Sequence, residues 1–101
     1  MGKTLMPSIE EIQSKARPIL ERYGVKRAAL FGSIVRGEAK VRSDVDFLVD
    51  LEQPIGLFRF AGLKQELEKT LGRTVDVVEY EAIKPLLRDR ILGEQVLILE
   101  R

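Results

Sequence analysis

Apolar residues recur every three or four positions near the start of the chain, which predicts an amphipathic helix. The repeating apolar positions are Ile9, Ile12, Ala16, Ile19 and Tyr23. Ser8 and Glu11 have the spacing of a capping box, so we expect the helix to begin there and to end near Gly24. Pro18 removes one backbone hydrogen bond inside this helix, which predicts a kink.

Short apolar runs predict the strands of a sheet. These runs are Arg27 to Phe31, Val45 to Leu51, Thr74 to Tyr80 and Val96 to Leu99. Successive side chains of a strand point to opposite faces. In the second run, one face therefore carries Val45, Phe47 and Val49, and the other carries Asp46, Leu48 and Asp50.

Helical segments alternate with these strands. Ser33 to Gly37 can form one helical turn, and Glu38 to Ser43 reads as a polar loop. Leu57 to Leu71 has the pattern of an amphipathic helix that stops at Gly72, and a shorter helix ends at Gly93. This alternation predicts an α/β (α+β) fold, a small mixed sheet flanked by helices. With no repeat or linker, residues 1–101 read as a single domain.

Composition narrows the chemistry. The chain of 101 residues has a net charge of +1, which argues against a strongly basic nucleic-acid surface. It contains no Cys and no His, so catalysis would depend on carboxylates, hydroxyls and bound metal. No apolar run approaches the roughly 18 residues of a membrane span, and residues 1–7 lack a signal-peptide pattern. We therefore expect a cytoplasmic protein that does not enter the membrane.

Aspartates in apolar strands are the first chemical signal. Asp44 and Asp46 lie two residues apart at the head of a strand, and Asp76 lies within a third. Buried ionised carboxylates are costly unless a cation or several donors satisfy them. A shared Mg²⁺ site on one sheet face explains them together, because Mg²⁺ binds a few carboxylates and keeps positions for water and phosphate. The alternative is an ordinary turn at Asp44 and two unrelated, satisfied aspartates.

The Gly32-Ser33 turn is the second signal, because it lies where a strand gives way to a helical turn. Free N–H groups at a helix start attract phosphate, Gly allows close approach, and the Ser33 hydroxyl can donate to a phosphate oxygen. The turn alone could equally be a helix N-cap. Arg36 could hold a phosphate, or could anchor the loop through Asp44 or a carbonyl.

Together these residues resemble the minimal nucleotidyltransferases (MNT) of the DNA polymerase β superfamily, known as antitoxins beside HEPN toxins. Gly32, Ser33, Asp44 and Asp46 fit the family pattern GS-x10-DxD, and YGVKRAALFGS, RGEA and SDVDFLVD are also similar to it. The resemblance extends from the first helix to the closing VLILE strand and implies the polymerase β palm fold. Ile34 and Val35 depart from it, because members often have an aromatic and a small residue there.

The resemblance implies roles for these residues. Gly32 and Ser33, with Arg36, would bind the triphosphate, Asp44 and Asp46 would coordinate two Mg²⁺ ions, and Asp76 would be a third carboxylate that assists the attacking hydroxyl. The implied reaction transfers a nucleotide, AMP from ATP, to a hydroxyl of a cognate HEPN toxin and thereby silences it. The chain would act as the antitoxin of a toxin-antitoxin pair.

Two other functions stay open on the sequence alone. A catalytically weak or inactive antitoxin could neutralise its partner by binding, using the apolar positions near the C-terminus. These positions are Leu86, Leu87, Ile91, Leu92 and the run VLIL. We expect them to pack on the sheet instead, which is the usual fate of helical apolar periodicity. An aminoglycoside-modifying nucleotidyltransferase would need an acceptor site supplied by a homo-oligomer.

Overall fold

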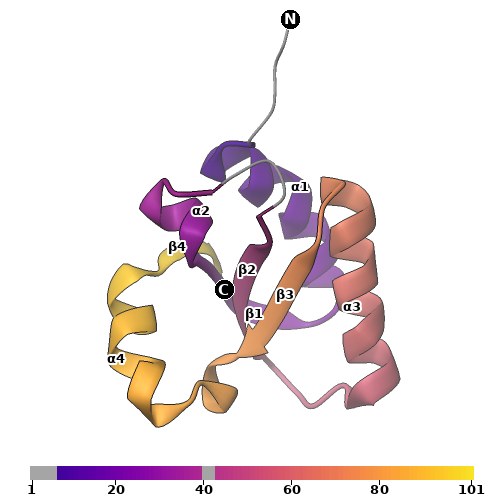
Figure 1. The fold of residues 1–101 in the computed structure, drawn as a ribbon. Coiled ribbons are helices and arrows are strands. Elements are labelled where there is room, and N and C mark those ends of the chain that lie inside the picture. The colour runs from indigo at the N-terminus through magenta and orange to yellow at the C-terminus, as the bar shows by residue number, and fades with distance from the viewer. Residues whose placement is uncertain (1–6, 40–42) are drawn as a thin grey trace, which may run out of the picture.

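One four-stranded sheet organises the computed structural model of the protein, which describes residues 7–39 and 43–101. In chain order the elements are α1 (Ile9–Arg22), β1 (Val25–Phe31), α2 (Ser33–Arg36), β2 (Val45–Leu51), α3 (Gly56–Leu71), β3 (Val75–Glu79), the 3₁₀ turn η1 (Tyr80–Ala82), α4 (Pro85–Glu94) and β4 (Val96–Glu100). The strand order is β3-β2-β1-β4 (Figure 1).

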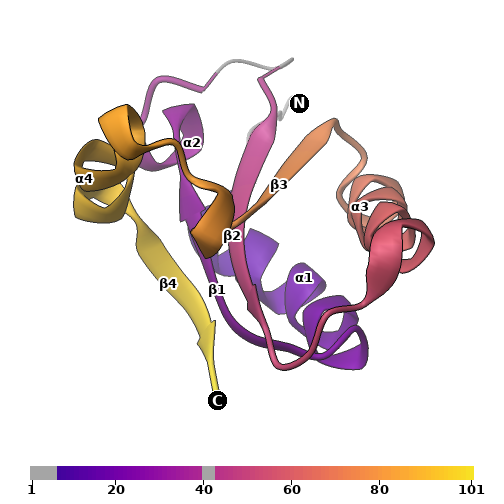
Figure 2. The same cartoon turned by 90° about the horizontal axis from the view of Figure 1, so that it is seen from below.

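The sheet is mixed, as the sequence predicts. Strand β1 pairs antiparallel with both β2 and β4, whereas β2 and β3 run parallel. A parallel pair needs a crossover connection, and α3 supplies it. The helices flank the sheet (Figures 1 and 2), so the predicted fold class is confirmed.

The main core lies between the sheet and the helices α1 and α3, which cover the same face (Figure 2). Val45, Phe47 and Val49 of β2 are fully buried in it, which confirms the alternation that the sequence predicts for this strand. Helix α1 contributes Ile12, Ala16, Ile19 and Leu20, and α3 contributes Leu63 and Leu67. Burial of this apolar face holds β2, and hence its polar face, in register with β1 and β3.

The opposite face of the sheet has a smaller apolar cluster. Ala29, Leu48, Tyr80 and Ile83 are buried together there. The η1 turn and α4 cover only this part of the face, with Ile91 and Leu92 of α4 partly buried against the cluster. The rest of this face is available for polar side chains, including the aspartates of β2 and β3.

Several element boundaries differ from the predicted ones. Strand β1 begins at Val25 rather than Arg27, because Val25 is buried and pairs with Leu51 across a bulge. The polar side chain of Lys26 interrupts the apolar pattern, so the sequence does not reveal this extension. Helix α1 continues through Pro18 as one element. Of the predicted loop Glu38–Ser43, residues 40–42 lie outside the described residues.

Helix α4 contradicts the expectation that the C-terminal apolar positions pack as core. None of its residues is buried, Leu86 is 98% exposed and Leu87 is 43% exposed. In β4, Ile98 and Leu99 are buried, but Leu97 is exposed. The prediction is therefore wrong for Leu86, Leu87 and Leu97. It holds in part for Ile91 and Leu92, which are partly buried because one edge of α4 meets the sheet.

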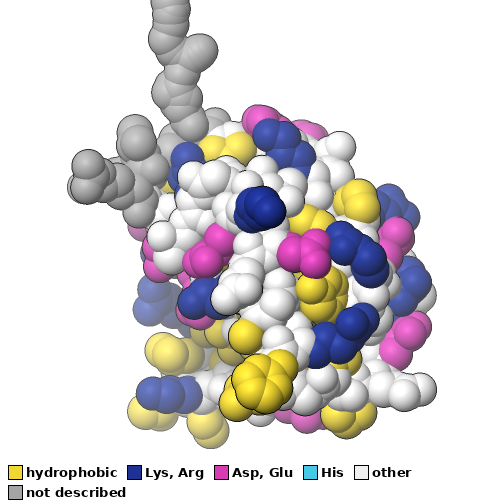
Figure 3. Space-filling view, turned by 90° about the vertical axis from the view of Figure 1, so that its right-hand side faces the viewer, with side chains coloured by type: hydrophobic (Ala, Val, Ile, Leu, Met, Phe, Trp, Pro, Cys, Tyr) yellow, Lys and Arg dark blue, Asp and Glu magenta, His cyan; other side chains and the backbone are white. Residues whose placement is uncertain are grey.

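The surface shows no extended region of one charge on the face drawn in Figure 3, where basic and acidic side chains are interspersed. Hydrophobic side chains gather toward the lower part of that view. Leu57 and Phe58, at the start of α3, are among the exposed large hydrophobic residues. Within residues 7–39 and 43–101, no helix is long and apolar enough to cross a membrane.

Candidate functional site

Asp46 and Asp76 occupy matching positions on neighbouring strands. They are direct partners in the parallel register between β2 and β3, with Val45 opposite Val75 and Phe47 opposite Val77. Directly paired residues of adjacent strands point to the same face of the sheet. Because Val45 and Phe47 point into the main core, both carboxylates lie on the other face. The structure therefore brings together two of the three predicted acidic residues.

The Gly32 turn lies directly against Asp46. Phe31, the last residue of β1, pairs with Asp46 in the antiparallel register, so the turn follows at the same level of the sheet. Gly32 has φ of +80° and is buried, and a Cβ atom at this position would collide with the carboxylate of Asp46. Only glycine satisfies both the backbone angle and the close approach.

The charge of Asp46 is poorly compensated. Burial, together with the neighbouring charges of Asp76 and Asp44, raises the pKa of the Asp46 carboxyl from 3.8 to about 6, although Arg36 opposes the shift. Asp44 lies two residues before Asp46 and is exposed. Asp46 is thus destabilised as an anion, which favours binding of a proton or a cation at its carboxylate.

Burial differs from the sequence-based expectation of embedded aspartates. Asp46 is only partly buried, and Asp76 is exposed because β3 is an edge strand of the sheet. The premise that Asp76 is a buried charge is therefore wrong. Its place opposite Asp46, rather than burial, is what connects it to the site.

The chemistry of these residues suits a divalent metal, but the described side chains do not by themselves form a complete set of ligands. Among the described residues, no group of three or more acidic side chains is arranged to hold a metal ion. The oxygen donors are of the hard type that Mg²⁺ prefers, and a cation would offset the burial and the neighbouring negative charges that raise the pKa of Asp46. The open side would leave coordination positions for water and phosphate.

Arg36 makes contacts that the sequence did not predict. Its guanidinium binds Glu38 through Nε at 2.9 Å, and Nη1 donates to both carboxylate oxygens of Glu94 at 3.1 and 3.2 Å. The partners proposed from the sequence were Asp44 or a carbonyl. Arg36 therefore joins the turn to the end of α4.

Glu94 is the residue of this region that sequence reasoning missed. Its Oε2 accepts a hydrogen bond from the Gly32 backbone N–H at 3.0 Å, in addition to the contacts with Arg36. Burial alone would raise the pKa of Glu94, but the Gly32 N–H and Arg36 outweigh it and lower the pKa. One sequence signal existed: an acidic residue in the last turn of a helix is unfavourable unless a partner compensates it.

The remaining residues of the turn fix its position. Ser33 is the first residue of α2 and is partly exposed. Ile34 and Val35, which depart from the family pattern, pack against the main core. Their apolar side chains anchor α2 to the sheet, so the departure has a structural role.

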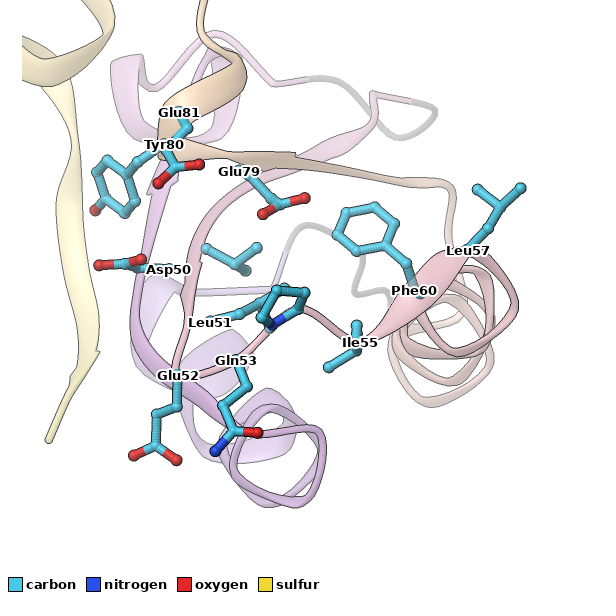
Figure 4. Close-up of a pocket in the computed structure, with 13 residues that line it drawn as sticks. Asp50, Leu51, Glu52, Gln53, Ile55, Leu57, Phe60, Glu79, Tyr80 and Glu81 are labelled. Atoms are coloured by element: carbon cyan, nitrogen blue, oxygen red, sulfur yellow. The ribbon is translucent and has the colours of Figure 1, made fainter.

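One cavity of the structure lies away from all of these residues. It has a volume of about 530 Å³ and is found at the other end of β2, between Val49–Leu51, the start of α3 and Glu79–Glu81 (Figure 4). Asp50, Glu52, Glu79 and Glu81 border it opposite Ile55, Leu57 and Phe60. None of the predicted site residues lines this cavity.

Residues 13–98 match the family described as nucleotidyltransferase domain. The chain belongs to this family, and its identification as a nucleotidyltransferase from the sequence is confirmed.

Named relatives are similar over most of the chain. A candidate protein adenylyltransferase of Methanocaldococcus jannaschii is 50% identical over 92 residues, covering 91% of this chain and 99% of the relative. The protein adenylyltransferase MntA of Thermococcus cleftensis is 41% identical over 97 residues, covering 92% of this chain and 98% of the relative.

Solved structures share the fold. A candidate minimal nucleotidyltransferase superposes with a TM-score of 0.76 at 35% identity, covering 94% of this chain and 98% of its own. A toxin-antitoxin complex with AMP-PNP gives a TM-score of 0.77 at 21% identity, covering 88% of this chain and 73% of its own. The complex of tri-AMPylated Shewanella oneidensis HEPN toxin with MNT antitoxin gives a TM-score of 0.71 at 18% identity, covering 91% of this chain and 72% of its own. The last two likenesses are of fold alone.

Proposed function

We propose that this protein is a magnesium-dependent adenylyltransferase that moves AMP from ATP to a hydroxyl of a cognate HEPN-type toxin and so acts as its antitoxin. The observation that carries the proposal is the register of Asp46 with Asp76, with the Gly32 turn against Asp46. The names of the relatives, protein adenylyltransferases, support the reaction type.

The proposed step is an in-line displacement at the α-phosphorus of ATP. The acceptor oxygen forms a new bond to this phosphorus while the bond to the bridging oxygen of the β-phosphate breaks. Pyrophosphate leaves with that electron pair, and the hydroxyl proton passes to the Asp76 carboxylate and then to solvent. Asp76 suits this role, because it is exposed to an incoming acceptor yet directly beside Asp46.

Asp44 and Asp46 would hold the metal, and Gly32, Ser33 and Arg36 would bind and orient the phosphates. Bound magnesium would neutralise charge on the phosphates and polarise the α-phosphoryl group. A site without Cys or His is adequate, since such transfer depends mostly on positioning and electrostatics.

A HEPN-type protein is the proposed acceptor. Solved structures with this fold include toxin-antitoxin complexes, and in one of these the HEPN toxin is AMPylated. The exposed Leu86 and Leu87 of α4 offer an apolar surface for such a partner.

The experiment is transfer of the AMP moiety to the purified partner. The protein is mixed with ATP, Mg²⁺ and the purified product of the neighbouring reading frame, which the proposal expects to be a HEPN-type protein, and intact mass spectrometry detects added AMP. We expect AMP on the partner with the wild-type protein and no addition with Asp46→Asn.

Asp50→Asn is the matched control. Asp50 lies four residues along β2 on the same face, at the other end of the strand, where it forms an ion pair with Lys26 at 3.9 Å. This variant should transfer AMP at the wild-type rate. Absence of transfer by the wild-type protein, or equal transfer by Asp46→Asn, would reject the proposal.

The second candidate is neutralisation by binding alone. The exposed leucines of α4 favour it, because they offer an apolar surface to a partner. Under this alternative, Asp46→Asn would still neutralise the toxin in cells, whereas Leu86→Ser would not.

A further inference from the structure

Glu94 occupies the hydrogen-bond donors that the proposed function assigns to phosphate. Its Oε2 accepts from the Gly32 N–H at 3.0 Å, and both of its oxygens lie within 3.2 Å of Arg36 Nη1. Two oxygens of one carboxylate thus bridge a backbone amide and a guanidinium, which is how a phosphate group is commonly held.

We propose that Glu94 is an internal competitor of the nucleotide: its carboxylate holds Gly32 and Arg36 in the free protein, and a bound triphosphate displaces it. This inference rests on the proposed function, because it names a residue that controls access to the same site. The displaced group is a side chain of this chain, so competition is present in every molecule.

The cavity around Glu94 is lined by positively charged side chains, which favour binding of an anion. A small cavity of about 150 Å³ between α2 and α4 is lined by Gly32, Arg36, Arg90 and Glu94, with Phe31, Leu87 and Ile91. Arg90 adds a second positive charge to that of Arg36. Two cationic side chains and one backbone donor exceed what a single carboxylate needs, but they suit a more highly charged phosphate chain.

Glu94 can leave without unfolding α4. The helix has no buried residue, so little apolar surface depends on the Glu94 contact. Gln95, the next residue, accepts a hydrogen bond from Tyr80 Oη at 2.6 Å, and Arg88 donates to the Tyr80 carbonyl at 3.1 Å. These contacts hold α4 in place, so rotation of the Glu94 side chain is enough to free Gly32 and Arg36.

The test measures binding of inorganic tripolyphosphate in metal-free buffer by isothermal titration calorimetry. This probe has the phosphate chain of ATP but no base, and it involves neither magnesium nor transfer. Glu94→Ala should bind it about threefold to tenfold more tightly than the wild type, since the competing contact is only partly exposed and of moderate strength.

Glu38→Ala is the matched control. Glu38 also pairs with Arg36, at 2.9 Å, but no hydrogen bond joins it to Gly32. Its removal should change tripolyphosphate affinity less than about twofold, because the pair is exposed. If Glu94→Ala fails to fold by circular dichroism, Glu94→Gln keeps the shape of the side chain and should show the same direction of change.

The outcomes separate this inference from the proposed function. Weaker or unchanged binding by the Glu94 variant, an equal effect of Glu38→Ala, or no binding by any variant would overturn the role of Glu94. Tighter binding by Glu94→Ala, together with absence of AMP transfer in the mass-spectrometric assay, would support Glu94 as a competitor of phosphate and reject the transferase proposal.

Discussion

At the scale of single residues, the site depends on one contact between a glycine and an aspartate. Gly32 has a backbone angle that side chains rarely adopt, and the Asp46 carboxylate fills the space where a Cβ would lie. A backbone strain and a steric conflict therefore act at the same position, and the conflict involves a candidate metal ligand.

Gly32→Ala should lower the free energy of unfolding by about 2 to 3 kcal/mol, since a strained backbone angle and a clash both contribute. Gly37→Ala is the control, because Gly37 has a similar φ of +74° but no atom within 4 Å of the added Cβ. It should cost only about 1 kcal/mol. Urea denaturation measures both, and equal losses would contradict a tight contact between Gly32 and Asp46.

The pKa of Asp46 predicts a pH dependence of stability. The folded-state pKa is about 6, raised by burial and by Asp76 and Asp44, against 3.8 when the chain is unfolded. The folded protein therefore binds a proton more tightly, and this contribution to stability is complete below pH 3.8 and is lost as the pH rises through 6.

Asp46→Asn cannot ionise at this position, so the variant should not lose stability as the pH rises through 6. The variant should match the wild type near pH 4 and be more stable by about 1 to 2 kcal/mol at pH 8, a value reduced by solvent at a partly exposed side chain. Denaturation midpoints at both pH values provide the measurement. A stability difference that does not change with pH would contradict the raised pKa of Asp46 in the folded protein.

At the scale of elements, β2 is the most predictable part of the fold and α4 the least. Alternation along β2 fixed Val45, Phe47 and Val49 to the core face, and the structure agrees. In α4, Leu86 has the same kind of periodic apolar context, yet it is 98% exposed. Periodicity predicts which residues share a helix face, but not whether another element covers that face.

In the candidate site, contacts between consecutive strands are easier to predict from the sequence than contacts between residues far apart in it. Gly32 and Asp46 could be connected from the sequence, because their strands are consecutive and antiparallel. Glu94 lies 62 positions from Gly32, and its contact exists only because β4 returns beside β1 and places the end of α4 at the turn. Likewise, the exposure of Asp76 depends on β3 being the sheet edge, which its own sequence does not reveal.

The exposure of α4 leads to a prediction about its leucines. Leu86→Ser should change the free energy of unfolding by less than about 0.5 kcal/mol, whereas Leu63→Ala in the core of α3 should cost about 2 to 5 kcal/mol. Leu63 is fully buried. Urea denaturation distinguishes the two, and a loss above about 1.5 kcal/mol for Leu86→Ser would show that α4 packs on another part of the chain.

At the scale of the whole molecule, the candidate site joins four separate segments. The turn after β1, the heads of β2 and β3, and the end of α4 supply its residues. Since a ligand that touches all four binds only the folded state, it should stabilise the whole chain.

Thermal denaturation tests this linkage. With Mg²⁺ and ATP at about 100 times the dissociation constant, the free energy of unfolding should rise by about 2.7 kcal/mol. ATP with a chelator should give a smaller rise, because the aspartates then repel the phosphates. Equal stabilisation with and without magnesium would indicate that nucleotide binds elsewhere.

The most direct test of the site is calorimetric titration of ATP in the presence of Mg²⁺, comparing the wild type with Asp46→Asn and with the control Asp50→Asn. If Asp46 faces both the metal and the Gly32 turn, Asp46→Asn should weaken binding at least about tenfold, since a charged ligand to magnesium is lost. Asp50→Asn should bind as the wild type does. Unchanged ATP affinity in Asp46→Asn would contradict the assignment of this sheet face as the nucleotide and metal site.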